Sequence, residues 1–160
     1  MTFSPMTILP ILLCLLLIGA AIQDARSLTI SNRWILAIIL LFVPYAWVAG
    51  IGFGVGWHLL HFVLALAVGM LLFALRWFGG GDAKLYAALA LWFPVQDGLR
   101  LLVTVSIAGF FVVMIYLAIA RFRKTGDKTE PLRKRRIPYG VAIAAGGIMV
   151  VANALLMPAA

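Results

Sequence analysis

Long apolar runs with few charges between them most constrain what this sequence can fold into. Of the 160 residues, 65% are hydrophobic and only 11% are charged, whereas a soluble domain carries about 25% charged residues. A water-soluble globule of this size cannot bury so much apolar surface. The runs also lack the polar–apolar alternation of β-barrel strands. These properties exclude a soluble enzyme, a disordered tail and a disulfide-rich secreted scaffold, and they predict an integral membrane protein.

Six apolar stretches predict an all-α, polytopic fold of about six transmembrane helices, in a single membrane domain over residues 1–160. Most of them approach the ~20 residues that a helix needs to cross a bilayer. The stretches are 6–23, 34–50, 57–75, 83–96, 99–120 and 138–157. The fourth is short and ends at Pro94. No Lys or Arg precedes the first, so we interpret it as a retained helix and not as a secretory signal.

The distribution of positive charge predicts the orientation in the membrane. If 24–33, 76–84 and 121–137 share one side, that side holds 12 of the 13 Lys and Arg residues, and only Arg100 lies on the other. Positively charged loops stay in the cytoplasm, which predicts that both termini lie outside it. We interpret the basic segment Arg121–Arg136 as a topology anchor that contacts anionic lipid head groups. From these features we expect the lipid bilayer to be a partner, and we expect no binding of nucleic acid.

Two of the five acidic residues are candidates for chemistry. Asp127 and Glu130 lie among cations in the basic segment, and Asp97 lies in a short turn. Asp24 and Asp82 lie at the ends of predicted helices, on the same cytoplasmic side. Acidic groups at the edge of the hydrocarbon are costly, which makes these two functional candidates. The alternatives are that Asp82 is a helix N-cap and that Asp24 is a surface partner of a nearby arginine.

Two aspartates brought together would form the catalytic pair of an aspartic peptidase. Like charges about 3 Å apart cannot both ionise cheaply, so the pair shares one proton. The ionised member takes a proton from water, which attacks a peptide carbonyl, and the protonated member hydrogen-bonds that carbonyl. If the helices end as predicted, their dipoles favour charge on Asp82 and the proton on Asp24. This chemistry needs no metal and no other cofactor.

Three motifs, in order along the chain, carry a resemblance to a known family. Gly79-Gly80-Gly81-Asp82-Ala83-Lys84-Leu85 matches the Gly-x-Gly-Asp-x-Lys-Leu motif of type IV prepilin peptidases. Asp24-Ala25-Arg26, followed by Ile30-Ser31-Asn32, resembles the family's Asp-x-Arg motif with a downstream Ile-Pro-Asn, with serine in place of that proline. The segment 138–147 resembles the family's final-helix signature. The likeness covers nearly the whole chain.

The resemblance implies an aspartic endopeptidase that removes the leader from type IV prepilins at the cytoplasmic face of the bacterial inner membrane. By that resemblance, Asp24 and Asp82 correspond to the two catalytic aspartates. Longer members also N-methylate the new amino terminus and carry paired zinc-binding cysteines, whereas this chain has only Cys14. It is therefore similar to the short form found with tight-adherence (Flp-type) pili, for which we expect no methyltransferase activity. Archaeal preflagellin peptidases are a neighbouring alternative.

Five further residues are predicted to support the aspartates or the substrate: Gly79, Gly81, Lys84, Arg26 and Tyr139. The glycines lack a Cβ, which lets backbone and substrate come close to the carboxyl group that follows them. Lys84 and Arg26 can lower the pKa of the neighbouring aspartate or serve as plain interfacial cations. Tyr139 either positions the substrate or anchors the last helix at the membrane surface.

The remaining polar and small residues are interpreted structurally. His58 and His61 are three residues apart and can share one helix face. No acid or cysteine lies near them in the sequence, so we predict no metal site there. Gly140, Gly146 and Gly147 are expected to allow close helix packing.

Two competing functions remain open from the sequence. A small transporter or pilus-assembly scaffold would use the aspartates to bind a proton or a cation. It would place acids near the bilayer midplane, whereas Asp24 and Asp82 are both predicted at one edge. A presenilin-like protease would cut inside the apolar helix of its substrate and not at the end of that helix.

Overall fold

The computed structural model describes residues 4–122 and 138–156. Within these two ranges the chain forms six α-helices, two short 3₁₀ helices and no β-strand. The α-helices are α1 (Pro5–Ser27), α2 (Asn32–Val48), α3 (Val55–Ala74), α4 (Gly80–Ala90), α5 (Gly98–Phe122) and α6 (Tyr139–Leu156), and the 3₁₀ helices are Gly52–Gly54 and Val95–Asp97. Most of the basic segment Arg121–Arg136 lies outside the described residues, so its predicted anchoring role stays a prediction.

Four of the described helical segments are long and apolar enough to cross a membrane. They are α1, α6, α3 together with the 3₁₀ helix before it, and Val95–Ile119, which comprises the second 3₁₀ helix and most of α5. Of the other two α-helices, α2 has 17 residues and α4 has only 11. Eleven residues rise about 16 Å, roughly half of the ~30 Å hydrocarbon thickness. The all-α, membrane-type fold is thus confirmed, whereas six crossings and external termini stay predictions.

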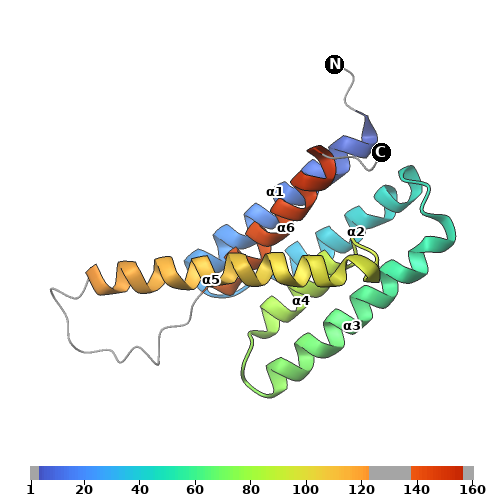
Figure 1. The fold of residues 1–160 in the computed structure, drawn as a ribbon. Helices are drawn as coiled ribbons and strands as arrows, with labels where there is room; N and C mark the ends of the chain where they lie inside the picture. Colours follow the sequence, from blue (N-terminus) through green and yellow to red (C-terminus); the bar gives the residue numbers. More distant parts are fainter. Residues whose placement is uncertain (1–3, 123–137, 157–160) are drawn as a thin grey trace.

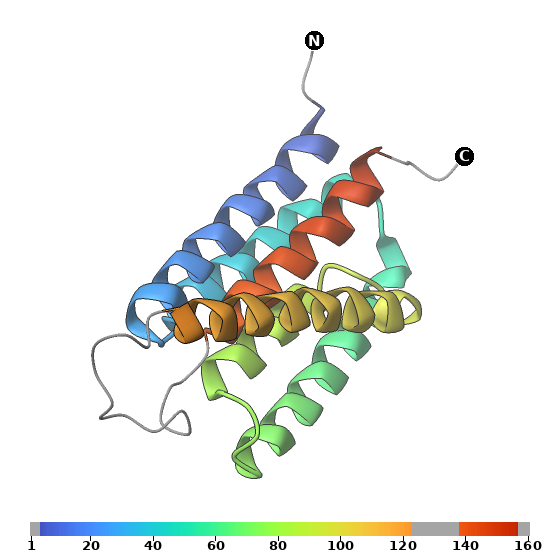
Figure 2. The ribbon, with the colours of Figure 1, turned by 60° about the vertical axis from the view of Figure 1, so that its left-hand side comes forward.

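The helices bring the two turns that flank the predicted aspartates to one end of the molecule. α1 lies beside α6, α3 packs on α4, and α5 crosses α6 obliquely (Figure 1). The view in Figure 2 shows the same pairs. The start of α1, the end of α6 and the α2–α3 turn lie at one end, and the α1–α2 and α3–α4 turns lie at the other. This arrangement places the carboxyl end of α1 near the amino end of α4.

The centre of the bundle is α4. Leu85 and the run 87–90 are fully buried, as expected for a helix that is apolar on every side. Small residues bring α6 close to its neighbours: a Cβ on Gly146 would stand 2.6 Å from the α5 backbone, and one on Gly147 would stand 2.7 Å from a leucine of α4. The interpretation of these two glycines as packing positions is confirmed. Large apolar side chains cover the outer faces of α1, α2, α3 and α5.

Two buried histidines of α3 complete the carboxyl end of α4. His58 Nδ1 lies 3.0 Å from the carbonyl oxygen of Leu91, and His61 Nδ1 lies 2.9 Å from that of Phe93. Leu91 is the cap residue that follows α4, and Phe93 lies beyond it. Neither carbonyl accepts a backbone hydrogen bond from the described residues, and each accepts one from a histidine ring N–H. In the part of the chain that the structure describes, no cluster of three or more His, Cys, Asp or Glu side chains could hold a metal ion.

Candidate active site

Asp24 lies in the last turn of α1 and is only 4% exposed. The sequence predicts that the helix ends before this residue, but α1 continues to Ser27. The helix ends at Leu28, whose left-handed backbone (φ 54°) directs its N–H to the carbonyl oxygen of Asp24 at 2.8 Å. This is a common way to end a helix. Asp24 is therefore held by a complete helical turn, with its side chain directed into the protein.

The carboxylate of Asp24 accepts a hydrogen bond from the first turn of α6. The N–H of Gly140 donates to Asp24 Oδ2 at 2.8 Å. A Cβ on Gly140 would stand 2.8 Å from that oxygen and 2.9 Å from Ile30 Cδ1. Only glycine fits at this position without displacing its neighbours. The amino end of α6 also carries a partial positive charge, which favours the ionised form of a carboxyl group beside it.

Asp82 lies in the first turn of α4, but it is not the residue that caps the helix. The cap is Gly79, whose backbone is extended (φ −75°, ψ 138°). Asp82 Oδ2 occupies the space where a side chain on Gly79 would begin. Asp82 Oδ1 is buried and has no hydrogen-bond partner among the described residues. Burial, with a smaller contribution from the charge of Asp24, raises the pKa of Asp82 to about 7.

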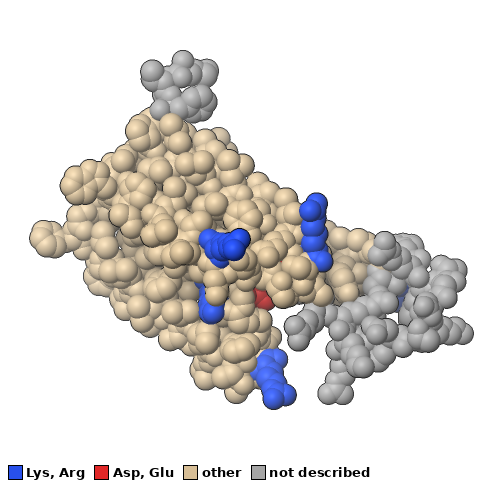
Figure 3. Space-filling model, turned by 180° about the vertical axis from the view of Figure 1, so that it is seen from behind, with Lys and Arg blue, Asp and Glu red and all other residues tan. Residues whose placement is uncertain are grey.

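Both aspartates line one cavity of about 590 Å³ at this end of the bundle. The other residues that line it come from the α1–α2 turn and from the end of α3 through the start of α4: Leu28, Phe73, Arg76, Trp77, Phe78, Gly79 and Gly80. Figure 3 shows an acidic spot among several Lys and Arg side chains on one face of the molecule. A cavity with two carboxyl groups in different surroundings is suited to acid–base chemistry on a bound molecule.

Two left-handed residues shape the wall of this cavity. Leu28 and Arg76 (φ 61°) are the only residues other than glycine with positive φ in the described ranges. Arg76 follows the end of α3, where the N–H of Trp77 donates to Leu72 O (3.0 Å) and the N–H of Arg76 donates to Phe73 O (2.9 Å). This hydrogen-bond pair reverses the chain sharply. The left-handed conformation costs about 1–2 kcal/mol per residue, and here both instances border the carboxyl groups.

The predicted supporting residues are only partly brought to the cavity. Gly79 lines it, and Gly81 packs on the other side, where a Cβ would stand 3.3 Å from Ile30. Lys84 is exposed and does not line the cavity. Arg26 is also exposed and lines a different pocket, between α1 and α2. The structure therefore does not join either predicted cation to the aspartates.

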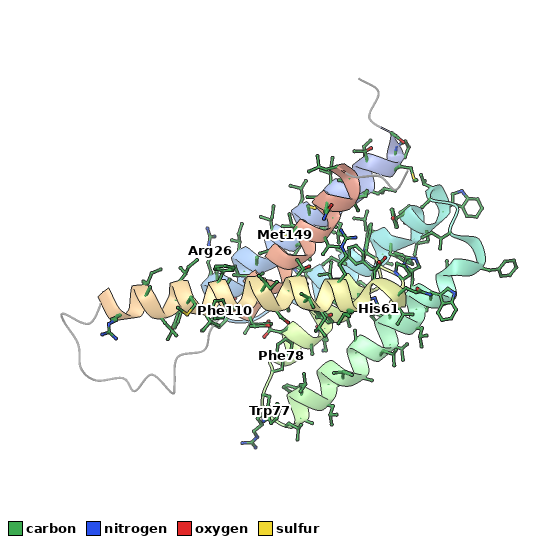
Figure 4. The ribbon with its side chains drawn as sticks, viewed as in Figure 1. Arg26, His61, Trp77, Phe78, Phe110 and Met149 are labelled. Carbon is green, nitrogen blue, oxygen red and sulfur yellow. The ribbon has the colours of Figure 1, made fainter. Side chains whose placement is uncertain are left out.

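Tyr139 does not line the cavity of the two aspartates. It lines a second, more apolar cavity beside it. Its ring packs edge-on against Phe78 with centroids 5.1 Å apart. A Cβ on Gly109 of α5 would stand 2.9 Å from the Tyr139 hydroxyl oxygen. Both aromatic rings line an apolar cavity of about 490 Å³ between α3, α4 and α5. Phe78 lines both cavities, so the two are neighbours through its ring. Figure 4 shows Phe78 and Trp77 on the side of α5 opposite Arg26 in that view.

Sequence reasoning missed four residues of this site. Arg76, Trp77 and Phe78 line the cavity, although none of the three was predicted to belong to the site. Gly140 was assigned to packing, whereas its N–H binds Asp24. The signal for Gly140 was its place at the start of the final-helix motif, directly after Pro138 and Tyr139. No sequence pattern indicates which aspartate that N–H would meet.

Comparison with known proteins identifies the family. The model of the type IV leader peptidase family matches residues 11–118, which is more than half of the chain and includes both aspartates. Comparison with curated proteins and with solved structures found no match. The extent of the family match supports the resemblance that the sequence motifs indicate. The chain belongs to the type IV leader peptidase family.

Proposed function

We propose that this membrane peptidase is an aspartic endopeptidase that removes the leader of a Flp-type prepilin at the cytoplasmic surface of the bacterial inner membrane. The observation that carries the proposal is the cavity that Asp24 and Asp82 line together. The two residues are 58 positions apart in the sequence, and they come from different helices. The motifs at both positions and the family match support the same reaction class.

The proposed reaction uses the two carboxyl groups as base and acid. Asp24, ionised, takes a proton from a water molecule, and the resulting hydroxide attacks the carbonyl carbon of the scissile peptide bond. Asp82, protonated, donates a hydrogen bond to the carbonyl oxygen, where negative charge develops. The tetrahedral intermediate collapses as the C–N bond breaks, and the proton held by Asp24 passes to the leaving amine. The pair thus ends each cycle with one shared proton.

The surroundings of the two aspartates support this distribution of charge, which is opposite to the one expected from predicted helix ends. Asp24 accepts the N–H of Gly140, and such a bond stabilises the ionised form. Asp82 Oδ1 is buried without a partner among the described residues, and such burial disfavours the ionised form. The pKa of Asp82, near 7, is consistent with a proton held there at neutral pH.

The neighbouring apolar cavity supports a substrate with an apolar segment next to its cleavage site. A prepilin, as the family resemblance implies, has a polar leader followed by an apolar helix. The carboxyl groups occupy one cavity, and the apolar one lies on the other side of Phe78. Affinity would then come from apolar packing of the substrate against α3 and α5. Methylation is not part of the proposal, because the chain has a single cysteine and lacks the paired cysteines of methylating members.

Co-expression with a Flp-type prepilin and mass measurement of the product test the proposed reaction. The expected product has lost its leader at the junction with the apolar helix and carries an unmethylated amino terminus. A product cut inside the apolar helix would contradict the proposal and favour a presenilin-like reaction. An unchanged prepilin, with the peptidase present in the membrane, would also contradict it and favour the transporter or scaffold interpretation.

A further inference from the structure

A third pocket lies between α1 and α2, separate from the cavity of the two aspartates (the carboxyl cavity) and from the apolar cavity beside it. It is open and has a volume of about 720 Å³. One end is polar, lined by Arg26 and Arg33 together with Ser27 and Ser31. None of the residues that line it also lines the cavity of the two aspartates. The peptidase reaction proposed above therefore makes no use of this pocket.

The polar end is held by one hydrogen bond across the α1–α2 turn and by the N-cap of α2. The side-chain oxygen of Gln23 accepts from the N–H of Ser31 at 3.1 Å, and Ser31 Oγ accepts from the N–H of Arg33 at 3.3 Å. These bonds fix the first turn of α2 against the last turns of α1. Arg26 of α1 and Arg33 of α2 thus line the same pocket. Two guanidinium groups with nearby hydroxyls are suited to a phosphate, which each group can bind through two parallel hydrogen bonds.

The other end of the pocket is an apolar trough. It is lined by Leu16, Gly19, Trp34 and Ala37, among others. Gly19 lets the indole of Trp34 lie directly against the backbone of α1, since a Cβ there would overlap the ring. A trough that runs from two cations into apolar surface fits a molecule with an anionic head and a hydrocarbon tail.

The length of the trough matches that of one lipid leaflet. From Arg26 to Leu16 the pocket follows ten residues of α1, which corresponds to about 15 Å of helix rise. Half of the ~30 Å hydrocarbon core is the same length. The two arginines also belong to the loops predicted to face the cytoplasm, so the head group would lie at that surface and the tails would point toward the midplane.

We propose that the α1–α2 pocket is a binding site for one anionic phospholipid, with the phosphate held by Arg26 and Arg33 and an acyl chain lying along Leu16, Trp34 and Ala37. This site is independent of the reaction at the aspartates. It assigns Arg26, which the sequence linked to the catalytic pair, to a lipid on the opposite side of α1. Binding would then depend on the charge of the one lipid head group held by the two arginines, and not on a general attraction of the protein to an anionic membrane surface.

Native mass spectrometry of the delipidated, full-length protein tests the proposal, with phosphatidylglycerol and phosphatidylcholine of identical acyl chains as probes. We expect one tightly retained phosphatidylglycerol and no retained phosphatidylcholine. The double variant Arg26→Gln/Arg33→Gln should bind phosphatidylglycerol at least about tenfold more weakly, because it loses the charge-assisted hydrogen bonds. The matched control is Arg100→Gln/Arg121→Gln, which removes the same charge from exposed positions outside the pocket and should bind like the wild type.

A second variant tests the trough without changing any charge. Ala37→Phe would fill part of the apolar end and should weaken phosphatidylglycerol binding severalfold. Equal weakening in both double variants would overturn the proposal in favour of general surface attraction. Binding of glycerol 3-phosphate as tight as that of the lipid, with no effect of Ala37→Phe, would overturn it in favour of a free phosphate ligand. Equal retention of phosphatidylcholine would also overturn it.

Discussion

Replacing Gly140 by alanine tests whether the backbone of α6 holds the catalytic base. The new Cβ would stand 2.8 Å from Asp24 Oδ2 and 2.9 Å from Ile30 Cδ1, both shorter than ordinary carbon contacts of about 3.5 Å. The carboxylate must move, and the 2.8 Å hydrogen bond from the Gly140 N–H must lengthen or break. A hydrogen bond to a charged group contributes about 1.5–3 kcal/mol, which corresponds to roughly a 10- to 150-fold change in rate. We therefore expect Gly140→Ala to slow leader removal by about that factor.

The assay is the rate of leader removal by purified protein from a purified Flp-type prepilin, with thermal unfolding in the same detergent as a measure of folding. Gly147→Ala is the matched control, because its Cβ would stand 2.7 Å from Leu89 Cδ2 and its nearest neighbours are leucine side chains. It introduces a similar steric conflict in the same helix, away from both cavities. If Gly147→Ala loses as much activity as Gly140→Ala, or if Gly140→Ala cleaves at the wild-type rate, the assigned role of the hydrogen bond is refuted.

Three further predictions follow from the same contacts. Leader removal should fall as the pH rises through about 7. Burial and the charge of Asp24 raise the pKa of Asp82 to that value, so above it Asp82 loses the proton that it donates. An activity that is constant from mildly acid to mildly alkaline pH would contradict this prediction. Gly79→Ala should displace the Asp82 carboxyl group and lower the cleavage rate at least about tenfold, whereas Gly56→Ala, with open space around it, should cleave normally. His58→Ala should lower the free energy of unfolding by about 1–3 kcal/mol, because it leaves the buried carbonyl oxygen of Leu91 without its hydrogen bond. The expected measurement is a lower melting temperature, and an unchanged one would contradict this role of His58.

The sequence predicted the fold class because membrane helices depend on local composition. Each predicted apolar stretch corresponds to one observed helix, and the observed bounds differ mostly at the ends. The largest difference is the stretch 83–96, where α4 is only Gly80–Ala90. Pro94 shortly after α4 cannot donate a helical hydrogen bond. The two buried histidines satisfy the carbonyl groups at that end. These contacts come from another helix, so local sequence patterns do not show them.

The sequence identified the two aspartates, but it did not reveal their surroundings. Motif spacing pointed to Asp24 and Asp82 as separate positions, and the shared cavity depends on how α1, α4 and α6 pack. The expected distribution of charge relied on helix ends alone. It changed because α6 supplies an N–H to Asp24 and because Asp82 Oδ1 is buried without a partner among the described residues. Neighbours in sequence were also a poor guide to neighbours in space: Arg26 and Lys84 lie within two residues of the aspartates, yet neither lines their cavity.

The rate of leader removal by Asp24→Asn and Asp82→Asn, measured separately on purified protein, tests the central claim most directly. Asparagine keeps the shape of each side chain but can neither take up nor donate the carboxyl proton. Each variant should cleave at least about a hundredfold more slowly than the wild type while keeping its melting temperature. Asp97→Asn, outside the carboxyl cavity, should cleave at the wild-type rate. Wild-type cleavage by either of the first two variants would contradict the claim that these carboxyl groups act together as the base and the acid.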